Sequence, residues 1–340
     1  MSEPGTPGFE LTIKDQTYTQ EGGQVLALTV ENHVDMVDML TVRLTLGEHQ
    51  GNPHWAFGDA VSCRIGEAGE AQFQGEITSM DPSFSGERLF TIVIRAMDRT
   101  HRLARGRATR IFEEQKDSDV VSSVGAECGL SVEAEGTRDT YPYIIQRNES
   151  NLAFLKRLAA RNNYQLRVVS GKLSFKKAQF SDAGKTLTMG ENVLSLRISF
   201  NTSDQVQEVV VRGWSIADKA EIVGTAKSGH VDPIGAGRLG MDIAGAFGKA
   251  TAYITDVPVA SQAAADAVAI AEINRMARQF ARGHCKIQGT HEVVAGGMVT
   301  FDNAPPGSNG AFHVLSCRQV ISPTSGWLTE FSFCGTSYGG

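Results

Sequence analysis

Alternation of apolar and polar residues is the feature that most constrains the fold of this 340-residue chain. In the first hundred residues, six segments alternate in this way and are separated by glycine-containing turns. They are FELTI (9–13), QVLALTVENH (24–33), MLTVRLTL (39–46), AVSCRI (60–65), AQFQGEITSM (71–80) and RLFTIVIRAMD (88–98). A period of two is typical of strands that bury one face and expose the other. Residues 1–104 are therefore predicted to form an antiparallel β-barrel or sandwich.

The pattern changes over residues 105–185. A short helix is expected from Ser118, a fair N-cap, to Gly129. A second helix is expected around 150–162 because apolar residues recur there at helical spacing. Its apolar stripe is formed by Leu152, Leu155, Leu158 and Ala159. Together with a strand at 141–146 and a hairpin across Ser170 and Gly171, these helices predict an α+β insertion domain.

Alternating strands resume at 191–201 and 205–214, and four more close the chain. Residues 215–258 are rich in glycine and alanine without a clear period, so we expect a long loop there. A helix is predicted over 261–282, capped by Ser261. Its apolar face is formed by Ala269, Ile273, Met276, Ala277 and Phe280. Residues 186–340 are therefore predicted to form a second barrel of the same topology, with this helix packed on it.

Trp214 lies at the end of the strand 205–214, just before the expected loop. A tryptophan in that place can close one end of a barrel, so we expect Trp214 to be a buried, structural residue. The fold class as a whole is mainly β, with two antiparallel barrels and a mixed insertion.

The composition is that of an ordinary globular protein, with 41% hydrophobic and 21% charged residues. The formal net charge is −6, which argues against a general nucleic-acid binder because such proteins carry a basic excess. No apolar run reaches the ~18 residues of a membrane-spanning helix, so no membrane anchor is expected. The N-terminal residues lack the pattern of a secretory signal, which predicts synthesis in a cytoplasm.

Five cysteines are present without any C-x-x-C pair: Cys63, Cys128, Cys285, Cys317 and Cys334. A zinc site or a disulfide framework is not expected from such a sparse set. All five lie in apolar or alternating segments, which favours buried thiols. A cross-strand disulfide among the last three is the alternative, since all three lie on predicted strands of one region.

Two glycine-rich strings match nucleotide-binding motifs only superficially. GAGRLG (235–240) follows Pro233 and lies in no strand–helix unit, so it is not interpreted as a dinucleotide site. GAFGKA (245–250) has Ala250 where a P-loop needs a hydroxyl for magnesium. The sequence also lacks H-E-x-x-H and G-x-S-x-G motifs. No catalytic residue, cofactor or metal site is therefore predicted.

One run of basic residues is the strongest charge feature of the chain. It comprises Arg99, Arg102, Arg105, Arg107 and Arg110, with no acidic residue between them. Such a run often forms a solvated face. Our functional hypothesis is an arm that docks onto an acidic protein surface. Nucleic acid is a weaker alternative because no aromatic residues lie between the arginines to stack on bases.

Three segments together resemble one known family. DRTHRLARGRATRIF (98–112) followed by SDVVSSVGAECGL (118–130) resembles the middle of phage late-control gene D proteins. YPYIIQRNESNLAFLKRLAARNNYQL (141–166) resembles a strand–helix signature that those proteins share with the valine-glycine-repeat spike proteins of type VI secretion. QEVVVRGWSIADKAEIVGTA (207–226) resembles the family's stretch around R-G-W. The resemblance covers residues 88–225; the late strands fit the fold, and the first 85 residues match only in pattern.

Proteins of this family are tail hubs of contractile phages and related injection machines. The resemblance implies a homotrimer in which each chain carries two barrels similar to the tail-tube fold, so that six barrels meet a six-fold tube. The partners implied are tail-tube and baseplate proteins and a separate spike protein, since the chain ends after its last predicted strand. The expected location is a virion tail or injection particle that assembles in a bacterial cytoplasm. The family has no catalytic residues to transfer to this chain.

Two other functional classes stay open at this stage. One is a cell-wall hydrolase of a tail tip, and the other is a monomeric carbohydrate-binding β-protein. The sequence does not distinguish a phage from a tailocin or an extracellular injection system, and it does not identify the spike.

Overall fold

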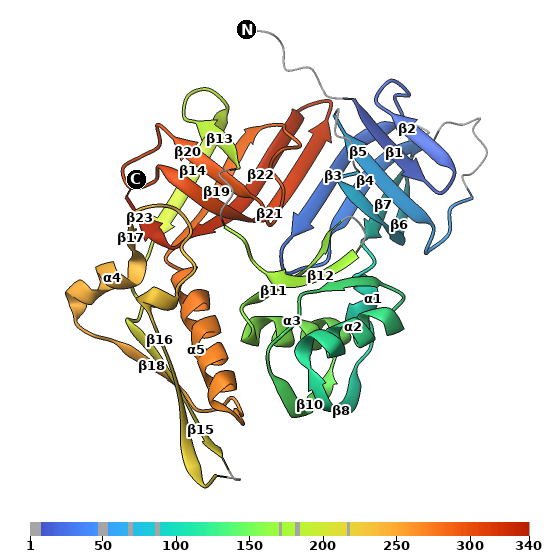
Figure 1. Cartoon of the computed structure of the whole chain (residues 1–340). Coiled ribbons are helices and arrows are strands. Elements are labelled where there is room, and N and C mark those ends of the chain that lie inside the picture. The colour runs from blue at the N-terminus through green and yellow to red at the C-terminus, as the bar shows by residue number, and fades with distance from the viewer. Residues whose placement is uncertain are drawn as a thin grey trace.

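The computed structural model describes residues 8–46, 54–66, 71–85, 89–169, 172–180, 184–215 and 218–339. Two curled β halves lie side by side, and two smaller α/β units extend from the same side of them (Figure 1). The predicted fold class, mainly β with a mixed insertion, is confirmed. The structure adds a second insertion that the sequence did not reveal.

The first half contains seven strands within the described residues. They are β1 (Phe9–Ile13), β2 (Gln16–Thr19), β3 (Val25–His33), β4 (Met39–Leu46), β5 (Ala60–Ile65), β6 (Phe73–Ser85) and β7 (Leu89–Met97). They pair antiparallel in the order β3-β4-β7-β6-β5-β1-β2. Alternation produces the core, as in β4, where Leu40, Val42 and Leu44 are buried.

The second half follows the same plan. Its strands are β13 (Lys185–Thr188), β14 (Val193–Phe200), β19 (Ala281–Gln288), β20 (Met298–Asp302), β21 (Gly310–Ser322) and β22 (Gly326–Gly335). Their order in the sheet is β14-β19-β22-β21-β20-β13. Leaving β2 aside, the strands correspond in both chain order and sheet order: β1 with β13, β3 with β14, β4 with β19, β5 with β20, β6 with β21, and β7 with β22. The expected common topology is confirmed in strand order, although β13 pairs parallel with β20 whereas β1 pairs antiparallel with β5.

The two halves are joined in one continuous sheet. Strand β21 pairs antiparallel with β3, from Ser316 opposite His33 to Ile321 opposite Leu28. This pairing links thirteen strands of the described residues into a single hydrogen-bonded sheet. The halves therefore form one rigid wall rather than two bodies on a linker.

The first insertion follows β7 and has its own core. It comprises α1 (His101–Ala104), β8 (Ala108–Lys116), α2 (Asp117–Glu127), β9 (Ser131–Ala134), β10 (Thr140–Glu149), α3 (Asn151–Arg161), β11 (Tyr164–Val169) and β12 (Lys172–Lys177). Ser150 caps α3 by accepting a hydrogen bond from the Ala153 amide at 3.2 Å. Leu155 and Leu158 are buried on the core side of α3, and half-buried Leu152 packs against the same cluster.

The first helix of this insertion begins earlier than expected. Ser118, the predicted N-cap, lies inside the first turn of α2, which begins at Asp117, and Lys116 occupies the N-cap position without a side-chain hydrogen bond. The turn predicted at Ser170 and Gly171 lies outside the described residues.

The prediction of a long loop at 215–258 is wrong, because most of this segment belongs to a second insertion. Strand β15 (Glu208–Ser215) forms a small sheet with β16 (Ala220–Lys227) and β18 (Thr251–Ile254). Further along are β17 (Arg238–Leu239), α4 (Gly240–Ala244) and two 3₁₀ turns at Ser228–His230 and Gly245–Phe247, and β17 pairs with β23 (Ser337–Tyr338). Helix α5 (Gln262–Ala277) covers one face of the small sheet.

Close packing explains why this segment is rich in glycine and alanine although it is not a loop. A Cβ atom added at Gly224 of β16 would lie 2.3 Å from the carbonyl group of Ala265 in α5. At Gly213 of β15 it would lie 2.4 Å from the Val259 side chain. Gly224 therefore lets α5 approach the small sheet closely, and it lies in a regular strand.

The predicted helix 261–282 is shorter than expected and packs elsewhere. It ends at Ala277, while Gly283 lies inside β19. Ile273 packs with Val209 and Val211 against the small sheet, not against the second barrel. Of the predicted apolar face, only Phe280, which lies beyond the end of the helix, enters the core of the second half. The insertion occupies the β14–β19 connection, which corresponds to the short β3–β4 turn of the first half.

Trp214 is not buried, so the expectation that it closes a barrel end is wrong. The side chain is 59% exposed on the face of the small sheet that α5 does not cover. The error follows from the assignment of strand 205–214 to a barrel, whereas β15 belongs to the second insertion.

The cysteines all carry free thiols. Four of them, Cys63, Cys285, Cys317 and Cys334, are buried, and Cys128 is half-buried. The buried-thiol interpretation is thus confirmed for four positions, and the alternative disulfide is absent. Among the residues described, no helix is long and apolar enough to cross a bilayer. The same residues contain no group of three or more His, Cys, Asp or Glu side chains arranged to hold a metal ion.

Candidate functional site

One face of the large sheet is polar across eight neighbouring strands, β14-β19-β22-β21-β3-β4-β7-β6, and we call it the polar sheet face. The pairing registers align its residues into rows that cross the strands. One row contains Arg197, His284, Ser332, Ser316 and His33. The next row contains Ser195, Lys286, Glu330, Arg318 and Glu31. The opposite face of the same strands forms the apolar cores.

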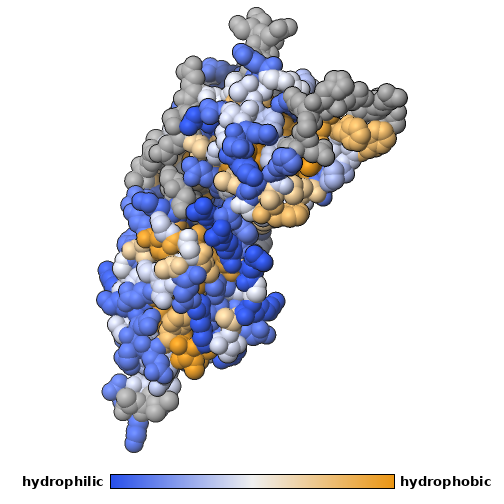
Figure 2. Space-filling model, turned by 90° about the vertical axis from the view of Figure 1, so that its right-hand side faces the viewer, coloured by the Kyte–Doolittle hydropathy of each residue, from blue (hydrophilic) through white to orange (hydrophobic). Residues whose placement is uncertain are grey.

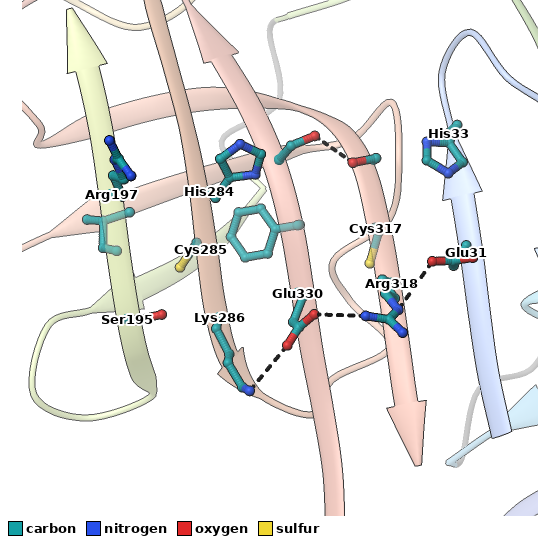
Figure 3. A pocket seen from close by; sticks show the side chains of 14 residues that line it. Glu31, His33, Ser195, Arg197, His284, Cys285, Lys286, Cys317, Arg318 and Glu330 are labelled. Carbon is teal, nitrogen blue, oxygen red and sulfur yellow. Dashed lines mark hydrogen bonds and ion pairs between the residues drawn. The ribbon is translucent and has the colours of Figure 1, made fainter. Parts of the chain in front are cut away.

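The second row is a chain of alternating charges. Lys286 Nζ lies 3.2 Å from Glu330 Oε1, and Arg318 lies 3.5 Å from the other oxygen of Glu330 (Figure 3). Arg318 Nε also lies 3.2 Å from Glu31 Oε1, so this chain of charges crosses the junction between the two halves. Each of these exposed pairs is worth only ~0–1 kcal/mol. The row therefore makes this surface hydrophilic but adds little to the stability of the fold.

The first row borders a hollow of about 440 Å³ on this face (Figure 3). The side chains of Arg197, His284 and His33 have no ion-pair partner among the residues that the structure describes. Ser316 and Ser332 hydrogen-bond to each other through their hydroxyls at 2.5 Å. Within the described ranges, no carboxylate forms an ion pair with either imidazole.

The polar sheet face continues over the first half. Its side chains there include Thr29, Thr41, Arg43, Arg95, Ser79, Asp81 and Ser83. Arg95 forms an ion pair with Asp81 near the outer end of this stretch. The two halves thus present polar surfaces on the same sheet face. A sequence pattern with period two indicates that each strand has a polar face, but it does not show that these faces lie on one sheet.

The arginine run is split between two structural clusters. Arg99 Nε lies 3.2 Å from Glu76 Oε1, while Arg102 and His101 hydrogen-bond to the same carboxylate. Burial alone raises the pKa of Glu76, but the hydrogen bonds from Arg102 and His101 and the neighbouring positive charges outweigh it and lower the pKa below its usual value. This cluster ties the start of the first insertion to β6.

The other end of the run lies within the first insertion. Arg110 donates to Gln146 at 2.7 Å and to Asn151 at 3.0 Å, and it pairs with Glu127 at 2.5 Å. Arg107 donates to the Asn148 carbonyl at 3.1 Å. Only Arg105 is exposed without a side-chain partner in the part of the chain that is described. The run is therefore not one continuous solvated arm, and its contact with another protein stays a prediction.

Sequence reasoning missed a large cleft of about 1330 Å³ between the two insertions and the end of the sheet. Its lining residues come from positions as far apart as Val34 and Cys334. Arg147, Lys156 and Arg282 line it without a carboxylate partner among the described residues. No local motif could reveal this cleft, because it exists only where three separately folded units meet.

Apolar patches interrupt a mainly hydrophilic surface (Figure 2). The exposed large apolar side chains of the described residues include Phe57, Phe84, Phe90, Ile111, Tyr143, Trp214 and Tyr253. Phe84 and Phe90 form a pair, with ring centroids 4.8 Å apart, at the outer end of β6 and β7. Contiguous apolar patches mark interaction sites, whereas single exposed apolar residues are normal on a protein surface.

Solved structures of similar fold are tail and secretion proteins. A 43 kDa tail protein of prophage MuSo2 from Shewanella oneidensis aligns with a TM-score of 0.72 at 16% identity, over 96% of this chain and 97% of that chain. A tail protein from Neisseria meningitidis MC58 aligns with a TM-score of 0.71 at 13% identity, over 96% of both chains. An Escherichia coli component of the type VI secretion system, described as structurally similar to two bacteriophage T4 tail proteins, aligns with a TM-score of 0.65 at 14% identity, over 97% of this chain and 78% of that chain. At these identities the similarity is one of fold.

No curated protein matches this chain in sequence. A match to a family model extends over residues 14–322, and the model is that of the Alg8 N-terminal domain. The chain therefore belongs to the Alg8 N-terminal domain family.

Proposed function

We propose that this chain is a structural hub of a contractile tail or related injection machine, of the late-control gene D type. In this role three copies adapt a six-fold tail tube to a three-fold spike. The observation that carries the proposal is the repetition of one six-strand order in both halves, joined in a single sheet. The fold shared with phage tail and type VI secretion proteins supports it.

The repeated strand order matters because a three-fold ring must offer six similar surfaces to a six-fold tube. Three chains with two equivalent halves each supply six such surfaces. Equivalent halves also keep the area buried against each tube subunit similar around the ring. Its partners would be tail-tube and baseplate proteins and a separate spike, in a virion tail or injection particle assembled in the bacterial cytoplasm.

A reconstruction of the whole particle without imposed symmetry tests this function. We expect three copies of the chain at the end of the tube, with both halves of each copy against tube subunits. Six copies, or a position away from the tube, would contradict the hub. Zymography on peptidoglycan with the purified chain tests the hydrolase alternative, and we expect no clearing.

A further inference from the structure

The large cleft between the two insertions is a binding site of a size that suits another protein. Its volume of about 1330 Å³ lies above the range of roughly 300–1,000 Å³ that is usual for small-molecule pockets. The two insertions extend from the same side of the large sheet, and both contribute residues to the lining (Figure 1). A space of this size accommodates a segment of polypeptide better than a small ligand.

Apolar side chains are exposed in this cleft. Tyr143 and Ile145 alternate along β10 of the first insertion, and they are 65% and 41% exposed. The second insertion contributes half-buried Val257 and exposed Pro258. Tyrosine is enriched among the residues that dominate protein–protein binding, and neighbouring apolar groups exclude water from such contacts. A partner that covers these side chains would therefore carry apolar groups of its own.

The cleft is positively charged although the chain as a whole is negative. Among the described residues, seven basic and four acidic side chains line it, whereas the net charge of the chain is −6. Three of the basic side chains form ion pairs with carboxylates. Arg147, Lys156 and Arg282 form none within the described ranges. A cleft with an excess of one charge focuses its potential and attracts groups of the opposite sign.

Arg278 is a fourth cation of the cleft without a carboxylate partner in the described part of the chain. Burial lowers the pKa of Arg278 below its usual value. Its guanidinium hydrogen-bonds to the side-chain oxygen of Asn163, while its Nε is buried without a described hydrogen-bond partner. Removal of a charge from water is costly unless a counter-ion compensates for it. A carboxylate from a bound partner would supply that counter-ion.

We propose that this cleft binds an acidic segment of a different protein. Apolar side chains of the segment would pack against Tyr143 and Ile145, and its carboxylates would meet Arg147, Lys156 and Arg278. The inference rests on the proposed function only for the source of the segment, which is another protein of the tail or injection particle.

Two other occupants fit the cleft less well. A second copy of this chain is a poor source, because no four consecutive residues of the sequence include three acidic ones. Nucleic acid matches the positive charge, but it binds to aromatic platforms and basic grooves and has no use for aliphatic groups such as Ile145 and Val257.

A photo-cross-linker in the cleft identifies the occupant. The substitution Tyr143→p-benzoylphenylalanine is made in cells that produce the chain together with its partners, and irradiation is followed by denaturing purification and mass spectrometry. We expect an adduct with a segment of a different protein in which acidic residues outnumber basic ones and alternate with apolar residues. Phe247→p-benzoylphenylalanine is the control, since Phe247 is 83% exposed and does not line the cleft.

Charge reversal tests the role of the cations. Two unpaired cations become anions in R147E/K156E, so the yield of the adduct at position 143 should fall by roughly tenfold or more. R105E/K172E is the matched control because it changes the net charge equally at two exposed residues outside the cleft, and it should leave the yield unchanged. Circular dichroism verifies that each variant is folded. Equal yields from the two double variants would overturn the proposal.

A synthetic peptide of the linked segment tests the role of its carboxylates. Replacement of its aspartates and glutamates by asparagines and glutamines should weaken binding to the purified chain by roughly tenfold or more, measured by fluorescence anisotropy. Equal affinities of the two peptides would contradict the acidic character of the occupant.

The outcomes separate the cleft from the function. The proposal is overturned by an adduct with nucleic acid, by an adduct with a second copy of this chain, by the same adduct from position 247, or by no adduct at position 143. Three copies at the end of the tube without an acidic adduct would leave the hub intact. An acidic adduct from a chain that is absent from the end of the tube would overturn the hub and leave the binding of an acidic segment intact.

Discussion

At the scale of single residues, half-buried Asp38 and buried His313 give the free energy of unfolding opposite dependences on pH. Burial raises the pKa of Asp38 from 3.8 to about 6. Burial, reinforced by the charge of Arg278, lowers the pKa of His313 from 6.5 to about 4. Between these values native Asp38 holds a proton that the unfolded chain releases, so its contribution to the free energy of unfolding is lost as pH rises from about 4 to about 6. The unfolded chain binds a proton at His313 that the native state does not, so that contribution grows as pH rises from about 4 to about 6.5.

The variants D38N and H313Q should separate these two effects. In D38N the free energy of unfolding should rise with pH over this window more steeply than in wild type, because the opposing group is gone. In H313Q it should rise less steeply, or fall. For each group, a difference of two pKa units between the native and unfolded states changes the free energy of unfolding by roughly 2–3 kcal/mol across this pH window. Urea unfolding at several pH values measures the slopes, and slopes parallel to wild type would show that these groups do not titrate as described.

Trp214 provides a second test at this scale. Since its side chain is 59% exposed, W214A should change the free energy of unfolding by about 0.5 kcal/mol or less, as for most surface substitutions. A buried tryptophan would cost ~3–5 kcal/mol. Thermal unfolding distinguishes these outcomes, and a large loss would mean that Trp214 packs against a neighbouring segment.

At the scale of elements, the contact between α5 and the small sheet depends on a missing side chain. The variant G224A places a Cβ atom 2.3 Å from the Ala265 carbonyl group and must push the helix away. We expect a loss of ~1–3 kcal/mol, the usual cost of overpacking. Gly229 is the matched control because a Cβ there meets nothing within 4 Å, so G229A should leave the melting temperature nearly unchanged. Equal melting temperatures for the two variants would contradict the close approach.

At the scale of the whole molecule, the proposed hub depends on contacts between its exposed side chains and other chains of the particle. The variant F84D puts a charge into the exposed ring pair of Phe84 and Phe90, which would suit an apolar contact, so it should reduce the yield of particles. The fold should persist, because Phe84 is 60% exposed in the single chain. F57D is the control, since Phe57 is 69% exposed but is not part of this pair. Particle yield and circular dichroism measure the two effects, and normal particles from F84D would contradict the proposed contact.

The sequence by itself determined the strands and the two related halves, because these follow from local periodicity. The alternation in MLTVRLTL buries Leu40, Val42 and Leu44 and exposes Arg43 in β4, and no distant residue is needed to predict this. The stripe on α3 and the buried thiols were predictable for the same reason, since each depends on the apolar character of its own segment.

Only the tertiary structure decided where the segments pack and which side chains meet. The sequence around Gly224 indicates a loop, but in the structure this glycine lies in a strand that packs against α5. Trp214 is expected in a core from its sequence, but its strand belongs to the second insertion and leaves it exposed. Arg99 and Arg110 look like members of one basic arm, yet each meets a carboxylate supplied by another segment, Glu76 and Glu127. The polar sheet face arises from pairings between strands hundreds of residues apart. Local periodicity specifies which face of a strand is apolar, but it carries no information about which strand becomes the neighbour. That choice depends on the total apolar area buried and on hydrogen bonds between distant segments.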